Sequence, residues 1–296
     1  MPYRLPTVLT LAAALLAAAC VTPPEQDAAR RATTQPSTSS ASPMSTSAMA
    51  TTTTSAQPPP TTTATPPVWV VGANPLPLRP DGFGKVLPTP AVLVNRSLPT
   101  ADRLPPPTGG YVSTVNPVPS AVLSRSTWQP DCPVGVGDLR YLTMSFWGYD
   151  GRAHTGEMIV NAQAAQGVTR VFGKLFEARF PLEEMRVTAR PELDLHPTGD
   201  GNNTTAFVCR PAVNLKTWSA HAYGLAIDVN PFCNPYIKGD LVLPELASSY
   251  VDRKNARPGM IYAGDAVVRA FTDIGWTWGG TWTSPRDIQH FSATGR

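Results

Sequence analysis

Two histidines and two aspartates toward the C-terminus have spacings that suit a hydrolytic metal site. His221 precedes Asp228 by seven residues, with a glycine between them, and Asp287 precedes His290 by three. Two histidines, one aspartate and an open position are a ligand set for a catalytic zinc ion. A further carboxylate suits a general base that takes a proton from water activated by the metal. The pattern therefore indicates hydrolysis with Zn2+ as the cofactor.

The surroundings of Asp228 strengthen this interpretation. The residue lies in the apolar run 225–229, which predicts a strand. A charge buried in a strand is costly unless it is paired or binds a metal. The alternative is that Asp228 caps the turn after this strand. That alternative accounts for Asp228 alone, and leaves His221 and the Asp-x-x-His segment to be explained separately.

Three motifs together resemble the zinc D-Ala-D-Ala carboxypeptidases and L-alanyl-D-glutamate endopeptidases, the VanY-like branch of the hedgehog-type metallopeptidase fold. They are Ser-x-His-x-x-Gly-x-Ala-x-Asp at 219–228, Trp-Gly-Gly-x-Trp at 278–282 and Asp-x-x-His-Phe at 287–291. The resemblance covers residues 132–296. It implies an α+β fold with a central, mostly antiparallel sheet, and peptidoglycan stem peptides as substrates.

The resemblance also implies a role for each motif residue. Asp287 activates the attacking water, Arg210 holds substrate, and Ser219 contacts substrate near the metal. The scissile bond stays open, because carboxypeptidase and endopeptidase members share the metal motif. The implied Zn2+ ligands are His221, Asp228 and His290.

The aromatic residues and the other histidines are less informative. Trp276, Trp278 and Trp282 are expected to line the cleft, and core packing beside Gly279-Gly280 is an equally good expectation for any one of them. His154 and His196 lie in polar turns. They are expected at the surface or in supporting positions.

Residue patterns independently predict an α+β domain. Leu139 to Trp147 is apolar and aromatic, as in a strand, and Asp150-Gly151 predicts a turn after it. Apolar residues recur at three- and four-residue steps in 156–180, which predicts a long amphipathic helix. Strands and helices are segregated, so a mostly antiparallel sheet with flanking helices is expected. Further strands are predicted at 184–188, 205–210 and 225–229, and further helices at 244–250 and 265–274.

The N-terminal residues predict export. Residues 1–20 have a positive start, an apolar Leu and Ala run, and small residues before Cys20. These features resemble a secretory signal of the lipoprotein type, with a lipid anchor expected at Cys20. The alternative is an ordinary signal peptide cleaved nearby. We expect a cell-envelope protein that is held at the outer face of the membrane or secreted.

The composition then changes twice before the catalytic domain. Residues 21–67 are rich in Thr, Ser and Pro, and are expected to be a disordered linker because they bury too little apolar surface to fold. Residues 68–126 keep dense prolines and short apolar pieces, which favour an extended stalk over helices or central strands. The alternative is that the apolar pieces are short strands or extended chain laid against the domain. The catalytic domain is expected at 127–296, as a monomer.

Three cysteines remain if Cys20 carries lipid. Export permits a disulfide, and an odd number leaves one thiol free. Cys132 opens the domain and Cys209 ends a predicted strand, which favours a Cys132–Cys209 bond with Cys233 free. A Cys209–Cys233 bond is the rival.

Charge and motif content exclude some classes of function. The formal net charge is only +3 and no basic stripe is present, which argues against nucleic-acid binding. The interpretation as a serine hydrolase that uses Ser219 and His221 has little support, because the sequence contains no nucleophile elbow. The main alternative to a peptidase is a catalytically silent cell-wall-binding domain on the same fold.

Overall fold

The structure is a computed structural model that describes residues 69–213 and 215–295. The predicted signal peptide, its lipidation site Cys20 and the linker at 21–67 lie outside these residues. Within them, no helix has the length and apolar character needed to cross a membrane.

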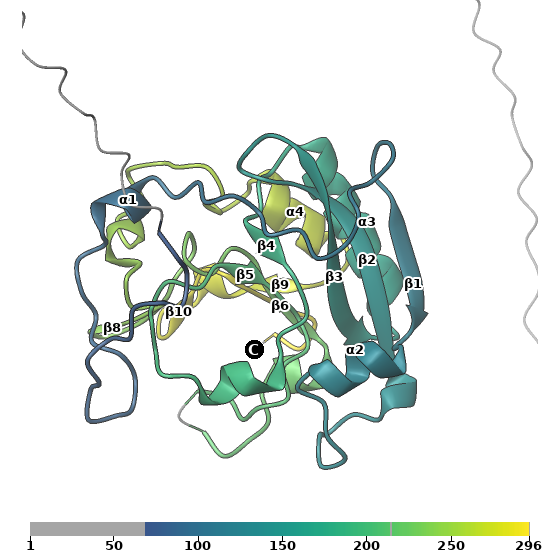
Figure 1. The fold of residues 1–296 in the computed structure, drawn as a ribbon, viewed down its shortest axis with the longest axis horizontal. Coiled ribbons are helices and arrows are strands. Elements are labelled where there is room, and N and C mark those ends of the chain that lie inside the picture. The colour runs from purple at the N-terminus through teal and green to yellow at the C-terminus, as the bar shows by residue number, and fades with distance from the viewer. Residues whose placement is uncertain (1–68, 214, 296) are drawn as a thin grey trace, which may run out of the picture. The chain divides into compact units, whose positions relative to one another are not determined.

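The predicted α+β class is confirmed (Figure 1). The antiparallel strands are distributed over three small sheets, and a short parallel pair, β4 with β5, is added to them. The α-helices of the described residues are α1 (Ala91–Val94), α2 (Ser120–Arg125), α3 (Ala165–Glu177) and α4 (Ala266–Thr272). The strands are β1 (Ser113–Pro117), β2 (Leu139–Trp147), β3 (Ala153–Asn161), β4 (Glu184–Met185), β5 (Asn203–Thr204), β6 (Ala226–Asp228), β7 (Tyr236–Lys238), β8 (Leu241–Leu243), β9 (Thr277–Trp278), β10 (Arg286–Asp287) and β11 (His290–Ser292).

The longest strands form a hairpin at the predicted Asp150-Gly151 turn. Strand β2 has the predicted bounds and pairs along its whole length with β3. The helix predicted over 156–180 is therefore wrong in its first part, because Gly156 to Asn161 belong to β3. A tight turn beside an already formed strand offers these residues a complete ladder of hydrogen bonds, which overrides their helix-like apolar spacing. The helix α3 begins only at Ala165.

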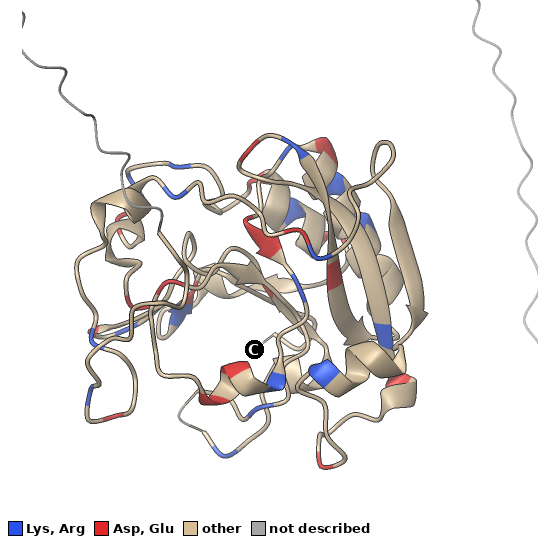
Figure 2. Ribbon diagram, in the orientation of Figure 1, with Lys and Arg blue, Asp and Glu red and all other residues tan. Residues whose placement is uncertain are grey.

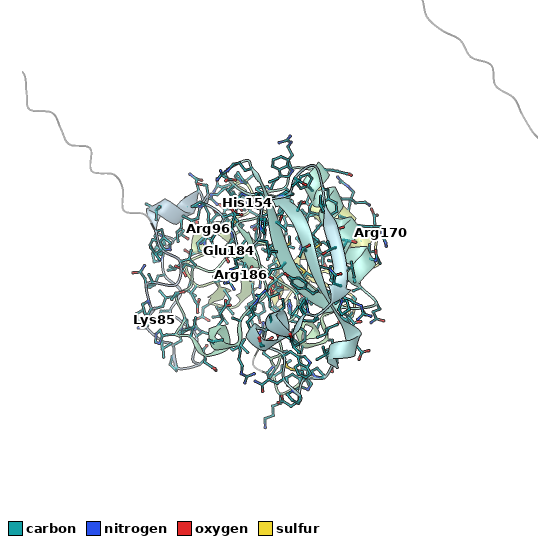
Figure 3. All side chains as sticks on the ribbon, turned by 45° about the vertical axis from the view of Figure 1, so that its right-hand side comes forward. Lys85, Arg96, His154, Arg170, Glu184 and Arg186 are labelled. Carbon is teal, nitrogen blue, oxygen red and sulfur yellow. A yellow bond between two sulfur atoms is a disulfide. The ribbon has the colours of Figure 1, made fainter. Side chains whose placement is uncertain are left out.

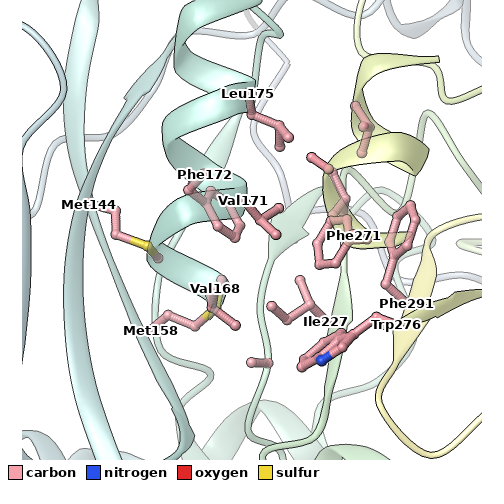
Figure 4. Packing of buried hydrophobic residues seen from close by; sticks show 14 of the residues in the cluster. Met144, Met158, Val168, Val171, Phe172, Leu175, Ile227, Phe271, Trp276 and Phe291 are labelled. Atoms are coloured by element: carbon pink, nitrogen blue, oxygen red, sulfur yellow. The ribbon is translucent and has the colours of Figure 1, made fainter. Parts of the chain in front are cut away.

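The main core lies on both sides of α3. One face of this helix packs on Met144 and Met158 of the hairpin, and the other faces α4 and the strands around Phe291 (Figure 4). Helix α4 begins at its cap Asp265, whose side chain accepts a hydrogen bond from the backbone N–H of Val268, close to the bounds predicted for it.

Other predicted elements are shorter than expected. The strand predicted at 184–188 is reduced to β4, and 205–210 forms a single bridge, from Thr205 to Asp228, instead of a strand. The helix predicted at 244–250 is wrong over most of its length, since only Ser248–Tyr250 turns, as the 3-10 helix η4. Local apolar runs of this length do not distinguish a strand from a buried loop.

The stalk predicted over 68–126 is also wrong for the described residues. Strand β1 pairs with β2 to complete the first sheet, and Leu76 and Leu93 are buried in a second apolar cluster. Arg96 forms an ion pair with Glu183 in which both side chains are almost fully buried; Arg96 is labelled in Figure 3. The short helices α1 and α2 also lie in this segment, so its prolines prevent neither helix nor the packing of extended chain on the domain. The described residues, 69–213 and 215–295, belong to one compact unit.

The predicted disulfide is confirmed. Cys132 and Cys209 are bonded with their Cα atoms 5.9 Å apart, and Cys233 is free and buried. The bond closes a loop across a sequence separation of 77 and joins the start of the predicted catalytic domain to the chain just before the His221 motif.

Charged residues of both signs are interspersed over the fold (Figure 2). Several of them pair locally, as Arg186 does with Glu184 and Glu192. This distribution agrees with the small net charge.

Candidate active site

His221 is held in a short capped turn. It lies in the 3-10 helix η3 (Ala220–Tyr223), and the side chain of the N-cap Ser219 accepts a hydrogen bond from the backbone N–H of His221. Gly224 ends the turn with φ at 66°, and a Cβ there would come within 2.6 Å of the backbone nitrogen of Asn161. Only glycine fits that position, which accounts for the glycine in the motif.

Asp228 and His290 are placed by strand pairing. Strand β11 pairs antiparallel with β6, and His290 lies directly opposite Asp228 in the register. Strand β9 flanks β11 on its other side. The two side chains are therefore fixed by backbone hydrogen bonds between segments that are far apart in the sequence.

The three predicted ligands converge. Nε2 of His221 lies 3.2 Å from Nδ1 of His290 and 3.3 Å from Oδ2 of Asp228. Nδ1 of His290 lies 3.1 Å from Oδ1 of Asp228. One donor atom from each residue falls within 4.8 Å of the others, so this group can hold a metal ion.

The proton positions suit a cation. Nδ1 of His221 lies 2.6 Å from the carbonyl oxygen of Ala206, so it carries the proton and leaves a lone pair on Nε2. That lone pair points toward the nearest nitrogen of His290 and the carboxylate of Asp228. The donor set of two imidazoles and one carboxylate matches zinc. The residues present therefore fit the metal that the sequence predicts.

The carboxylate of Asp228 is strongly biased toward its charged form. Burial by itself would raise its pKa, yet His221 and His290 lower it well below the usual range. A carboxylate that stays ionised at any ordinary pH is a permanent anionic ligand.

Asp287 has the opposite bias. It is the last residue of β10. Burial raises the pKa of its carboxyl group to about 7, and the negative charge of Asp228 adds to this rise. His290 and Arg210 act in the other direction. In the described part of the chain, its buried Oδ1 atom has no hydrogen-bond partner. This carboxylate is placed to exchange a proton with a molecule in the cleft.

These residues line one cleft of about 930 Å³. Arg210 and Ser219 also line it, as predicted, and the backbone N–H of Ser219 donates to the carbonyl oxygen of Arg210. Their contact with substrate stays a prediction. The volume suits a ligand of several residues.

Of the three tryptophans expected at the cleft, only Trp282 lines it, with its ring centroid 5.5 Å from that of His290. Trp276 and Trp278 are buried in the main core, and the indole N–H of Trp278 donates to the carbonyl oxygen of Ile288. The other two histidines are absent from the residues that line the cleft. His154 is buried between Asp102 and Asp150, and His196 contacts the backbone of Leu76.

Sequence reasoning missed several residues of the cleft. Trp218 is next to the first motif, and its large side chain beside Ser219 was a usable signal. No sequence signal marked Tyr236 and Lys238 as site residues, because strand β7 reaches the cleft only through its pairing with β10. The missed residues that line the cleft include Trp218, Tyr236, Lys238 and Gln289.

Comparison with known proteins agrees with the motifs. Residues 213–293 match the family model described as D-alanyl-D-alanine carboxypeptidase. The matched segment contains all four predicted metal and base residues and leaves out Arg210. No curated protein and no solved structure matches the chain. The predicted resemblance is confirmed by this match, which supports a peptidase of the carboxypeptidase type.

Proposed function

We propose that this chain is an exported zinc peptidase that hydrolyses peptide bonds in peptidoglycan stem peptides. One observation carries the proposal: the half-buried carboxylate of Asp287, with its Oδ1 atom buried, shares a cleft with three converging metal-binding atoms. A carboxylate with a raised pKa beside a group of metal-binding residues is typical of a functional site, which supports an enzyme over a silent binding domain. The family match supports the same substrate class.

The metal-binding residues and Asp287 have different roles in the proposed hydrolysis. His221, Asp228 and His290 would hold Zn2+, which when bound polarises a carbonyl group and acidifies water. Asp287 accepts a proton from the water molecule while the oxygen of that water attacks the scissile carbonyl carbon. The same carboxyl group then gives that proton to the leaving amine, so that the C–N bond breaks and Asp287 returns to its starting state.

Other residues of the cleft would position the substrate. The guanidinium of Arg210 is a suitable partner for a carboxylate of the stem peptide, since its five donors match carboxylate geometry. Ser219 lines the same cleft beside Arg210. A positioned peptide bond reacts faster, because the entropy of alignment is lost on binding and not in the reaction.

The location and state of the protein are part of the proposal. The lipoprotein-type signal and Cys20 would anchor the chain at the outer face of the membrane, where peptidoglycan lies, or the chain would be secreted. The Cys132–Cys209 disulfide supports an oxidising compartment. We propose that the domain acts as a monomer and binds no nucleic acid.

The test uses a stem pentapeptide that contains both candidate bonds. Purified protein loaded with Zn2+ is incubated with the peptide L-Ala-D-Glu-L-Lys-D-Ala-D-Ala, and the products are identified by mass. Release of D-Ala indicates a carboxypeptidase, and release of L-Ala indicates an endopeptidase. Chelation should stop the reaction and Zn2+ should restore it. Binding of peptidoglycan with no cleavage of any stem peptide would favour the silent wall-binding domain.

A further inference from the structure

Tyr236 stands beside the predicted base. Strand β7 pairs antiparallel with β10, and Tyr236 is the register partner of Asp287. Directly opposite residues of an antiparallel pair project to the same face with their Cβ atoms about 4.5–5.5 Å apart. The two side chains therefore point into the same cleft, and both line it.

The Tyr236 hydroxyl is unusual for a buried tyrosine. The side chain is only 8% exposed, yet among the described residues no atom forms a hydrogen bond with its hydroxyl. The other two buried tyrosines are satisfied: the hydroxyl of Tyr141 donates to Glu157, and that of Tyr250 accepts from the backbone of Arg96. A hydroxyl on the wall of the cleft that the described residues leave without a partner is available to a ligand in the cleft.

The hydroxyl is suited to donate and not to accept a proton. Burial raises the pKa of Tyr236 above its usual range, and the negative charge of Asp287 adds to the rise. The phenol therefore keeps its proton throughout the pH range in which a peptidase works. It can stabilise a developing negative charge without changing its own protonation state.

Resting on the proposed function, we infer that Tyr236 is a catalytic residue whose hydroxyl donates a hydrogen bond to the oxygen of the scissile carbonyl. The water that Asp287 deprotonates must lie within about 3–3.5 Å of the carbonyl carbon for attack. A donor that projects beside Asp287 from the neighbouring strand is within reach of the oxygen on that carbon. As the water oxygen bonds to carbon, the carbonyl π electrons move to this oxygen, and the donated hydrogen bond strengthens with its charge.

The deciding variant is Tyr236→Phe, which removes the hydroxyl and keeps the ring. Tyr223→Phe is the matched control, because Tyr223 is 37% exposed and does not line the cleft. We expect Tyr236→Phe to lower kcat by about 100-fold, as the loss of one oxyanion donor does. KM, bound zinc and Tm should stay near the wild-type values, because the hydroxyl has no partner in the free protein. The control should match the wild type.

Other results separate the inference from the proposed function. Unchanged kcat in Tyr236→Phe, or a raised KM with kcat unchanged, would overturn the inference and leave the peptidase assignment intact. A second measurement is the Kd of a phosphinate dipeptide, whose tetrahedral oxygens resemble the charged state. In Tyr236→Phe, the Kd of the phosphinate should rise by at least the factor by which kcat falls. An equal Kd in Tyr236→Phe and the wild type contradicts the inference. A wild-type protein that cleaves no stem peptide overturns both.

Discussion

Asp228 and His290 are register partners, one on β6 and one on β11, with Oδ1 and Nδ1 3.1 Å apart. Their geometry is set by the backbone ladder and not by loop conformation, so the ligand pair is as rigid as the sheet that carries it. His221 reaches the same point from a capped turn. Sites held on regular elements keep their geometry better than sites on loops.

The first prediction concerns metal binding. Zn2+ should stabilise the wild-type protein, by about 2.7 kcal/mol at a free concentration of 100 Kd. In His290→Ala, the shift in Tm caused by zinc should disappear, because one of three ligands is lost. Thermal unfolding with and without Zn2+ measures this. His196→Ala is the control, since His196 lies outside the cleft, and it should keep the shift. An equal shift in His290→Ala would rule out this ligand set.

The second prediction separates the base from the ligands. Asp287→Asn should keep the zinc-induced shift in Tm, because Asp287 is not among the converging ligands. It should lose about 100-fold to 10,000-fold in turnover, since an amide cannot accept the proton. Zinc content and turnover of the stem pentapeptide are measured on the same preparation. Near-normal turnover by the zinc-loaded variant would assign the proton transfer to another group.

The third prediction concerns stability in acid. The side chain of Glu157 is 2% exposed and accepts hydrogen bonds from Arg125 and Tyr141. Burial by itself would raise its pKa, but these two partners lower it below the ordinary value of 4.5. The stabilisation by Glu157 is therefore complete above the unfolded-state pKa, and is lost as pH falls through the lower folded-state pKa.

Glu157→Gln tests this. Near pH 7 it should lower the free energy of unfolding by about 1–3 kcal/mol, the typical effect of removing a charged hydrogen-bonding partner. The difference from wild type should shrink as pH falls below 4.5, the ordinary pKa. Urea unfolding between acid and neutral pH measures it, with exposed Glu177→Gln as control. A difference that stays constant with pH would contradict the linkage.

The fourth prediction concerns the segment that was expected to be a stalk. The fully buried carboxylate of Asp200 accepts hydrogen bonds from the indole of Trp69, the backbone of Gly72 and the hydroxyl of Thr198. The neighbouring residues Gly199 and Gly201 line the cleft. The segment at Trp69 is thus joined to a wall of the site.

Asp200→Ala leaves these donors without their acceptor, and should lower the free energy of unfolding by about 1–3 kcal/mol. Because the same loop lines the cleft, KM for the stem pentapeptide should rise as well. Urea unfolding and steady-state kinetics measure the two effects. Asp194→Ala, at an exposed position of the preceding 3-10 helix, is the control. Wild-type stability in Asp200→Ala would show that the contact with Trp69 contributes nothing.

The fifth prediction concerns the anchor. Cys20→Ser should release the protein from the membrane fraction of its native host, because serine cannot carry the thioether-linked lipid. Fractionation followed by mass measurement of the processed N-terminus tests this. Cys233→Ser controls for the loss of a cysteine, and should stay with the membrane. Unchanged membrane association and processing of Cys20→Ser would favour an ordinary signal peptide.

The sequence by itself determined the parts whose signals are local. The motif with its glycine at 224 and the strand around Asp228 follow from residue types within one short segment. Strand β2 and the turn at Asp150-Gly151 are equally local, and both were predicted with the correct bounds. For the disulfide, the sequence favoured Cys132–Cys209 and left Cys209–Cys233 as the rival, and the structure contains the favoured bond.

The tertiary structure decided what depends on pairing between distant segments. Strand β3 has helix-like apolar spacing and forms a strand because β2 is beside it. Residues 69–126 have the composition of a stalk, yet they complete a sheet and supply the buried Arg96. Tyr236 has no motif, and faces Asp287 only because β7 pairs with β10. Hydrogen bonds between strands are specified by the whole chain, so no window of sequence contains them.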